Sequence, residues 1–363
     1  MPNKWVLPIA LALAAVTTPR LSAATSYTVD CGAGGSTSTL QTQLNAAVSS
    51  PGNTVTVTGT CSGDLSVLNA SSLKIVGLNL TGNLYIDHSR QVSFSATTTI
   101  TGSISLLRSR EVQFGTTVAN ANLTVSNGSQ VQFASLAMAP WSGTDPSINC
   151  LSQSDCNISS LSMSGLSSAA SIGVTVGSLS RLNLPAGTVS GFGTGLYVWN
   201  NAAAFMVSGC QAVNITSNVV MGVHVLDGGL VDFMGLSAAD ASSAGCPGAT
   251  TMNISGNGTY GLLVEGGGHA DLYQTTVKNQ SVDNVRVQNG AVVRIESSTI
   301  GAASTSGRSA RVATGGNLYF SELRAGPGAS STLSGPVCVT GNSSVDTNNS
   351  ATVITTSGTC TSP

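Results

Sequence analysis

A short phrase that recurs along the second half of the chain constrains its fold more than any other feature. Each copy reads small or polar, apolar, variable, valine. The copies lie at 173–176, 195–198, 222–225, 261–264, 284–287 and 309–312. Alternate side chains of a strand point to opposite faces, so each copy predicts one strand with two side chains on the same face. The valines are separated by 22, 27, 39, 23 and 25 residues, and repeats of that length predict a solenoid.

The first half of the chain repeats with a tighter spacing. Apolar-polar-apolar triplets begin at Leu65, Leu84, Ile104 and Leu123, which are 19, 20 and 19 residues apart. A second triplet of the same kind follows each of them. The second triplets are 73–75, 92–94, 112–114 and 131–133. Because like positions recur in every rung, neighbouring rungs are expected to build a continuous core that no single rung could form alone.

These repeats favour one fold class. Strands that stack at one per rung without reversing direction are parallel, and parallel crossovers are right-handed in nearly all cases. A left-handed hexapeptide helix needs a six-residue period that is absent, and a propeller needs more aromatic residues than the 4% found here. The low charge (8%) and the 42 glycines suit strands joined by tight turns rather than helices. We predict an all-β, single-stranded right-handed parallel β-helix.

The first residues have the features of an export signal. Lys4 precedes an apolar run over residues 5–16, and small residues at Ser22 and Ala24 fit a cleavage site. Twelve apolar residues are too few to span a bilayer. We therefore expect a signal peptide over 1–24 and one elongated β-helix domain over 25–363.

A short helix is predicted just before the first full rung. Ser38 and Gln41 have the spacing of a capping box, and Leu40, Leu44, Ala47 and Val48 fall on one helical face. An amphipathic helix in this place would cover the open end of a stacked core, which solenoids require. We expect residues 25–62 to form this N-terminal cap with the first rung.

Eight cysteines fit a chain that folds outside the cytoplasm, so we expect a secreted, periplasmic or cell-surface protein. They form sequence-local couples, and although 105 pairings are possible, local pairing is favoured because each rung of a solenoid touches only its neighbours. The expected couples are Cys31 with Cys61, Cys150 with Cys156, Cys210 with Cys246, and Cys338 with Cys360. Residues 137–170 are interpreted as a loop or a distorted rung, and 237–250 as one inserted loop held by Cys210.

The chain resembles the right-handed parallel β-helix, pectin-lyase-like superfamily. The Gly-Val-x-Val phrases, the run at 287–295 and the run at 54–61 after a helix carry the resemblance. The last of these is similar to the opening of many secreted bacterial β-helix proteins of unassigned function. The similarity covers nearly the whole mature chain and implies the fold. It implies no single activity, because this fold hosts lyases, hydrolases, epimerases, adhesins and inert rods.

Enzymes of that superfamily carry acids on adjacent rungs of an outward face, and one such column is predicted here. Seven residues past successive phrase-ending valines lie Asp232, Asp271, Arg294 and Tyr319. Neighbours in a column lie about 5 Å apart, so the two aspartates could share a proton or a Ca²⁺ ion, and Arg294 could neutralise an acidic sugar. The alternative is an exposed ion-pair ladder that contributes little to stability. Residues 84–88, which end in Asp87 and His88, partly resemble a motif of pectate lyases. The Arg-x-Pro motif that accompanies it in those enzymes is absent here.

A second outward column is predicted to bind substrate. It contains Tyr197, His224, Leu263, Arg286 and Arg311. The column beside it contains Trp199, Leu226, Glu265, Gln288 and Ala313. Tyr197 and Trp199 flank an inward valine and so point the same way, and exposed rings beside hydrogen-bonding groups can stack on sugar faces. Packing under the 237–250 loop and a dimer contact are the alternatives.

Two functions remain open at this point. The leading hypothesis is a non-catalytic extracellular or cell-surface rod that binds a polysaccharide or cell-surface glycan and needs no cofactor. The alternative is a polysaccharide lyase or glycoside hydrolase acting on acidic polysaccharide, with Ca²⁺ if it is a lyase. The balance of 13 basic and 15 acidic residues gives no footprint for nucleic acid, and no membrane insertion is expected. No metal site is predicted, because the three histidines lie far from the cysteines in sequence. The oligomeric state stays open.

Overall fold

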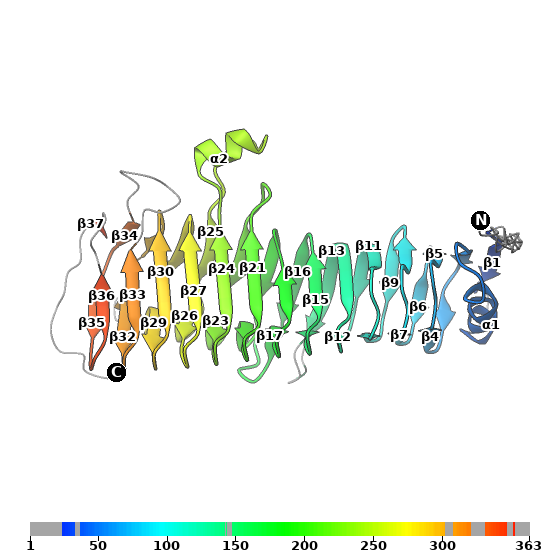
Figure 1. Cartoon of the computed structure of the whole chain (residues 1–363), viewed down its shortest axis with the longest axis horizontal. Helices are drawn as coiled ribbons and strands as arrows, with labels where there is room; N and C mark the ends of the chain where they lie inside the picture. Colours follow the sequence, from blue (N-terminus) through cyan, green and yellow to red (C-terminus); the bar gives the residue numbers. More distant parts are fainter. Residues whose placement is uncertain are drawn as a thin grey trace, which may run out of the picture.

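The computed structural model is an elongated coil of parallel strands. It describes residues 24–32, 37–141, 143, 147–301, 308–320, 331–346 and 351–352. The strands lie side by side along the long axis, in sequence order from one end of the rod to the other (Figure 1). Among these residues the strands form one 25-stranded sheet and one 12-stranded sheet, and each pairing between named strands is parallel, for example β20 with β23. The fold is a parallel β-helix, as the repeats predict.

Each full rung has three sides, which we call face 1, face 2 and face 3. Face 1 is the 12-stranded sheet. Its strands are β4 (Leu65–Leu68), β7 (Leu84–Asp87), β10 (Ile104–Leu107), β12 (Leu123–Ser126), β14 (Ile148–Cys150), β17 (Ile172–Val176), β20 (Thr194–Val198), β23 (Met221–Val225), β26 (Tyr260–Val264), β29 (Asp283–Gln288), β32 (Arg308–Ala313) and β35 (Val337–Val339).

Faces 2 and 3 make up the larger sheet, because two long strands of face 2 bend across both. Face 2 contains β1 (Ser26–Asp30), β2 (Thr54–Thr58), β5 (Lys74–Val76), β8 (Ser93–Ser95), β11 (Val112–Ala119), β13 (Gln130–Trp141), β15 (Asp155–Ile158), β18 (Arg181–Asn183), β21 (Ala203–Val207), β24 (Leu230–Met234), β27 (His269–Tyr273), β30 (Val292–Glu296), β33 (Asn317–Phe320) and β36 (Ser344–Asp346). Face 3 contains β3 (Cys61–Ser62), β6 (Asn79–Thr81), β9 (Thr98–Ile100), β16 (Leu161–Gly165), β19 (Gly187–Ser190), β22 (Val213–Thr216), β25 (Met252–Ser255), β28 (Thr275–Lys278), β31 (Thr299–Ile300), β34 (Ser331–Leu333) and β37 (Ala351–Thr352).

Like side chains stack on like side chains in the interior. The valines that end the repeated phrase are register partners in successive face 1 strands, and each is fully buried. This file consists of Val176, Val198, Val225, Val264, Val287 and Val312. In the first half, Phe114 stacks between Phe94 and Phe133 with ring centroids 4.4 and 4.6 Å away. Fully burying each such apolar side chain contributes about 1.5–3 kcal/mol to the free energy of unfolding. The stacked interior side chains are therefore a main source of stability.

The turn after each face 1 strand shares one backbone feature in all twelve rungs. One residue there is left-handed, with φ between 47° and 69°. These residues are Asn69, His88, Arg108, Asn127, Ser152, Ser178, Asn200, Asp227, Gly266, Asn289, Thr314 and Gly341. The repeated conformation lets one turn stack on the next, although only two of the twelve are glycine.

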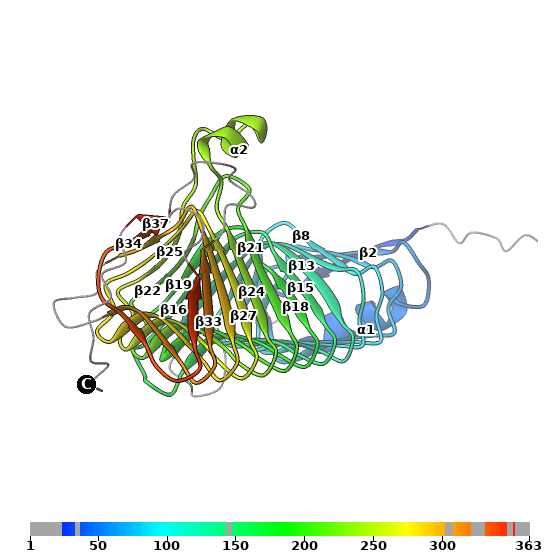
Figure 2. The ribbon, with the colours of Figure 1, turned by 60° about the vertical axis from the view of Figure 1, so that its left-hand side comes forward.

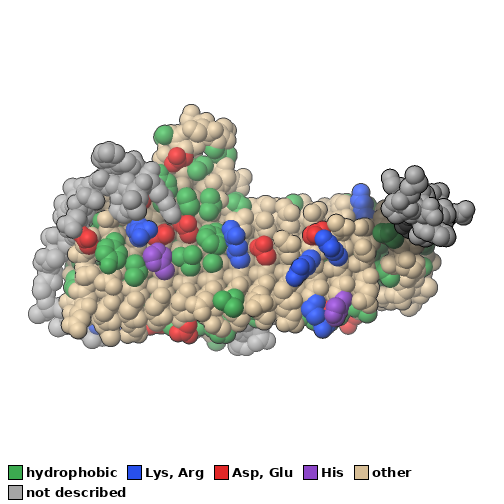
Figure 3. Space-filling model, in the orientation of Figure 1, with side chains coloured by type: hydrophobic (Ala, Val, Ile, Leu, Met, Phe, Trp, Pro, Cys, Tyr) green, Lys and Arg blue, Asp and Glu red, His purple; other side chains and the backbone are tan. Residues whose placement is uncertain are grey.

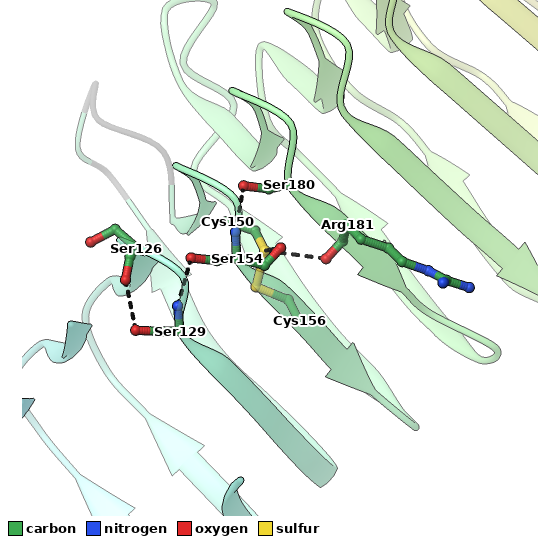
Figure 4. The surroundings of a disulfide bond; sticks show 7 residues. All are labelled: Ser126, Ser129, Cys150, Ser154, Cys156, Ser180 and Arg181. Carbon is green, nitrogen blue, oxygen red and sulfur yellow. Dashed lines mark hydrogen bonds between the residues drawn. A yellow bond between two sulfur atoms is a disulfide. The ribbon is translucent and has the colours of Figure 1, made fainter. Parts of the chain in front are cut away.

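Buried hydroxyls tie these turns together. In five consecutive described turns a serine Oγ accepts a hydrogen bond from the backbone N–H of the preceding rung, at 3.0–3.2 Å. The ladder is Ser89, Ser109, Ser129, Ser154 and Ser180, each at most 2% exposed. Figure 4 shows part of it beside a disulfide. Paired buried polar groups avoid the cost of an unsatisfied donor, so the turn ladder is rigid.

The N-terminal end is covered as predicted. Helix α1 (Thr37–Ala47) buries Leu40, Leu44 and Ala47 completely. The predicted capping box is wrong, because the Gln41 amide instead bonds the backbone N–H and C=O of Ser66 at 2.9 and 2.8 Å. Ser66 belongs to β4, the outermost strand of face 1. The helix therefore supplies partners to an open strand edge as well as apolar cover.

Three of the predicted disulfides are present. They join Cys31 to Cys61, Cys150 to Cys156, and Cys210 to Cys246. The fourth predicted couple includes Cys360, which lies outside the described residues, as do residues 1–23 of the predicted signal peptide. The prediction of a loop or distorted rung over 137–170 is confirmed between Met138 and Trp141, where the register of β13 on β16 shifts. It is wrong around Cys150 and Cys156, which lie in regular strands β14 and β15 and are fully buried.

The insertion at 237–250 is more than a loop. It contains helix α2 (Ala238–Ser243), whose capping box joins Ser237 and Asp240, and it projects from the rod (Figure 2). The Tyr273 hydroxyl donates to Asp240 at 3.1 Å, which fixes the insertion to face 2. The sequence missed the helix because only six residues form it. In the described part of the chain, no helix has the length and apolar character needed to cross a membrane.

Candidate functional site

The predicted binding column exists on face 1. The register pairs Tyr197 with His224, His224 with Leu263, Leu263 with Arg286, and Arg286 with Arg311. The side chains alternate with the buried valine file, so they point outward. Each is half-buried except Leu263, which is 6% exposed. The repeat spacing therefore placed five residues from five rungs correctly.

The rings of Tyr197 and Trp199 lie stacked with nearly parallel planes, and we call this pair the aromatic platform. Their ring centroids are 6.5 Å apart and their planes differ by 15°. The indole lies against the backbone of the preceding rung, because a Cβ at Gly177 would meet Trp199 Nε1 at 2.3 Å. The His224 ring is 5.1 Å from the Tyr197 ring. Only a residue without a side chain at 177 lets Trp199 lie down in this way.

A chain of polar side chains continues from the platform across the next rungs. His224 Nε2 lies 2.9 Å from Glu265 Oε1, and the Gln288 amide donates to the other oxygen of Glu265. Arg286 Nε donates to Gln288 Oε1 at 2.9 Å, and another guanidinium N–H donates to the Tyr260 hydroxyl at 2.6 Å. Each group holds the next in one orientation. The surface beside the rings is therefore preorganised for hydrogen bonding.

The electrostatics of this chain centre on Glu265. Burial by itself raises the pKa of the Glu265 carboxyl, but hydrogen bonds from Gln288 and His224, with the nearby Arg286, hold that pKa below its usual value. Burial, followed by the charges of Asp227 and Glu265, raises the pKa of the Tyr197 hydroxyl. At neutral pH the site therefore presents a carboxylate and a neutral phenol.

Arg311 follows Arg286 in the same column. Its Nε is buried and has no hydrogen-bond partner among the described residues. The sequence grouped these two arginines correctly and placed Glu265 and Gln288 in the column beside them. It missed Tyr260, and it did not predict the hydrogen bonds that join these side chains to Arg286 and His224. Tyr260 lies four residues before Val264, the valine that ends its phrase, and so outside the position that the repeat marks as outward.

The predicted acidic column exists on face 2. Asp232 pairs in register with Asp271, Asp271 with Arg294, and Arg294 with Tyr319. The column also extends backwards to Phe205, whose ring lies 4.6 Å from the guanidinium carbon of Arg181. Hydrophobic and charged side chains gather over β21 to β33 in Figure 3, and further charged side chains lie nearer the N-terminal end.

Asp271 is engaged by neighbours on two sides. Its Oδ1 lies 3.0 Å from His269 Nε2 and 3.7 Å from an Arg294 guanidinium nitrogen. The Asp271 side chain is 15% exposed, whereas that of Arg294 is 40% exposed. The histidine is two residues away on the same strand and was not grouped with the aspartate by the sequence analysis. This arrangement is an ion-pair cluster around the Asp271 carboxylate.

The third candidate from the sequence, Asp87 with His88, forms ion pairs on the surface of the rod. Arg108 binds both carboxylate oxygens of Asp87 at 2.7 and 3.1 Å, and His88 lies 3.0 Å from the same carboxylate. Within the described ranges, no group of three or more His, Cys, Asp or Glu side chains is placed to hold a metal ion.

Comparisons with known proteins add no assignment. No family model matches the chain, and neither does any curated protein or solved structure. The fold defines the class, a parallel β-helix, and the function has to be inferred from the geometry of its faces.

Proposed function

We propose that this protein is a secreted, non-catalytic β-helix that binds glycan chains through face 1, outside the cell or at its surface. The observation that carries the proposal is the aromatic platform of Tyr197 and Trp199 beside an oriented polar chain. Flat rings stack on the apolar faces of sugars, and fixed polar groups beside them bond hydroxyls. Three disulfides fit an oxidising compartment, and the β-helix architecture supports membership of the pectin-lyase-like superfamily.

Binding is favoured over catalysis by the state of the carboxylates. A general base or a lyase metal site needs a carboxylate that is open to substrate or ion. Asp271 instead contacts His269 and Arg294, and Glu265 contacts His224 and Gln288. Side chains held in this way can orient a ligand without reacting with it.

The binding test uses a panel of immobilised polysaccharides, including cellulose, xylan, mannan, pectin and alginate. Trp199→Ala and Tyr197→Ala should each weaken binding about tenfold, which corresponds to about 1.4 kcal/mol. Tyr85→Ala is the matched control, since Tyr85 occupies the same face 1 column nearer the N-terminus. Equal binding by the platform variants and the control, or no binding to any of the glycans, would rule out the proposal.

The second candidate is a polysaccharide lyase or hydrolase that uses Asp232, Asp271 and Arg294. The confirmed register of these three residues is what favours it. Product release from pectin or alginate by the purified protein, abolished in Asp232→Asn and Asp271→Asn, would establish it. Turnover that survives both substitutions would remove this site.

A further inference from the structure

A groove runs along the turns that follow the face 1 strands. Its volume is about 540 Å³, and it crosses four successive turns between Asn127 and Asn201. Its lining consists of amide and hydroxyl side chains, the side chain of Leu179, and one charged residue, Arg110, at one end. The groove therefore offers hydrogen-bonding groups and an apolar contact with little charge.

The groove is lined by three side chains at a turn position that is glycine in the neighbouring rungs. From the fourth rung to the eleventh, the turn has a second left-handed residue directly after the first. Five of these eight second positions are glycine, at 128, 228, 267, 290 and 315. The other three are consecutive: Gln153, Leu179 and Asn201, with φ of 62°, 63° and 56°. All three line the groove.

Two of those three side chains, Gln153 and Leu179, have a local cost, because asparagine adopts the left-handed region more readily than they do. A left-handed backbone is unfavourable for residues with a Cβ, most of all for one such as leucine, and glycine adopts it freely. The Leu179 side chain is also 59% exposed, so it gains little from burial. Strained residues that cluster at a concave surface point to a role other than stability.

The floor of the groove is rigid. Ser154 directly follows Gln153, and Ser180 directly follows Leu179. The backbone N–H of Ser154 donates to Ser180 Oγ at 3.0 Å, and that of Ser129 donates to Ser154 Oγ at 3.2 Å (Figure 4). The spacing of the groove side chains is thus fixed by the serine ladder.

The groove begins where the aromatic platform ends. Asn200 and Asn201 follow Trp199 in the chain. The indole of Trp199 lies against Gly177, which precedes Ser178 and Leu179. One ligand can therefore contact the platform and the groove together.

We infer that the glycan bound by this protein is an extended, uncharged polysaccharide chain that lies from the platform along the turns, with Gln153, Leu179 and Asn201 as successive contact residues. This inference rests on the proposed glycan-binding function and names its substrate class. Amides bond the sugar hydroxyls, and Leu179 contacts the apolar face of a sugar ring.

The test measures binding of cello-, xylo- and manno-oligosaccharides by calorimetry, from the disaccharide to the hexasaccharide, with oligogalacturonides as the acidic series. The double variant Gln153→Gly/Leu179→Gly introduces the residue that other rungs use, so its melting temperature should equal or exceed that of the wild type. Its affinity for a neutral hexasaccharide should fall about tenfold, while its affinity for the disaccharide stays unchanged. Asn279→Gly, an exposed left-handed position away from the groove, is the control and should bind like the wild type.

The outcomes separate this inference from the function on which it rests. Affinity that rises with chain length and depends on Gln153 and Leu179 supports it. Binding that needs Trp199 but has no dependence on chain length, or is unaffected in the double variant, overturns the groove and leaves the platform in place. A preference for oligogalacturonides overturns the uncharged class. No binding of any series overturns both the groove and the glycan-binding function.

Discussion

At the scale of single residues, two positions determine the geometry of the candidate binding site on face 1. The aromatic platform depends on Gly177, because the indole of Trp199 occupies the space where any Cβ would stand. The polar chain depends on Glu265, which is the shared partner of His224 and Gln288. The role of each residue becomes evident only from its contacts with the neighbouring rung.

Gly177→Ala should displace Trp199 without disturbing the stacked core. The added methyl would lie 2.3 Å from the indole nitrogen, and rotating one half-buried ring costs less than moving backbone. We expect a change in tryptophan fluorescence, glycan affinity reduced about tenfold as in Trp199→Ala, and a melting temperature close to that of the wild type. Unchanged fluorescence and affinity would show that the ring does not need this glycine.

Glu265 makes stability depend on pH in a defined direction. The folded pKa of this carboxyl is lowered, so its contribution is complete above the unfolded value, about 4.3, and is lost as pH falls through the folded pKa. Glu265→Gln should therefore be less stable than the wild type at pH 7, and the difference should shrink below about pH 4. Thermal unfolding of both proteins across this range measures it. A difference that stays constant down to low pH would contradict the assignment.

At the scale of elements, the disulfides differ in what they hold. Cys150 and Cys156 join a face 1 strand to a face 2 strand through the core and are fully buried. Cys210 is exposed, and its bond to Cys246 ties the α2 insertion to the rod. Access of a reductant is set by exposure, so the two bonds should behave differently.

Mild reduction of the folded protein should open Cys210–Cys246 first and leave Cys150–Cys156 intact. Alkylation followed by mass spectrometry identifies which cysteines react. Loss of the first bond should loosen the insertion with little change in melting temperature, because the hydrogen bond from Tyr273 to Asp240 still holds it. Equal labelling of all four cysteines without denaturant would contradict the buried position of Cys150–Cys156.

At the scale of the whole molecule, stability is shared between neighbours along one axis. Each rung contacts chiefly the rungs before and after it, so damage in one place should spread only a short distance. The phenylalanine stack lies in β8, β11 and β13, and the rungs of β14 and β17 separate it from β20, which carries Tyr197 of the platform.

Phe114→Ala removes the central ring of that stack and should destabilise the protein by about 3–5 kcal/mol. Hydrogen exchange should quicken in β8, β11 and β13, whereas β26 and β29 should keep their protection. Phe205→Ala, which truncates an outward ring on face 2, is the matched control and should change exchange little. Uniform loss of protection along the rod would mean that it unfolds as one cooperative unit instead.

The sequence by itself determined the coil, the inward file of valines, the two outward columns and three disulfide couples. It could do so because strand alternation has a period of two, and a repeat carries that alternation unchanged from rung to rung. Only the tertiary structure decided that Trp199 lies against Gly177 and that Asp271 contacts His269 and Arg294. It also decided that helix α2 is bonded to face 2 and that three side chains line a groove at the turns. These depend on rotamers and on left-handed turn residues, where the chain meets the adjacent rung rather than its own neighbours in sequence.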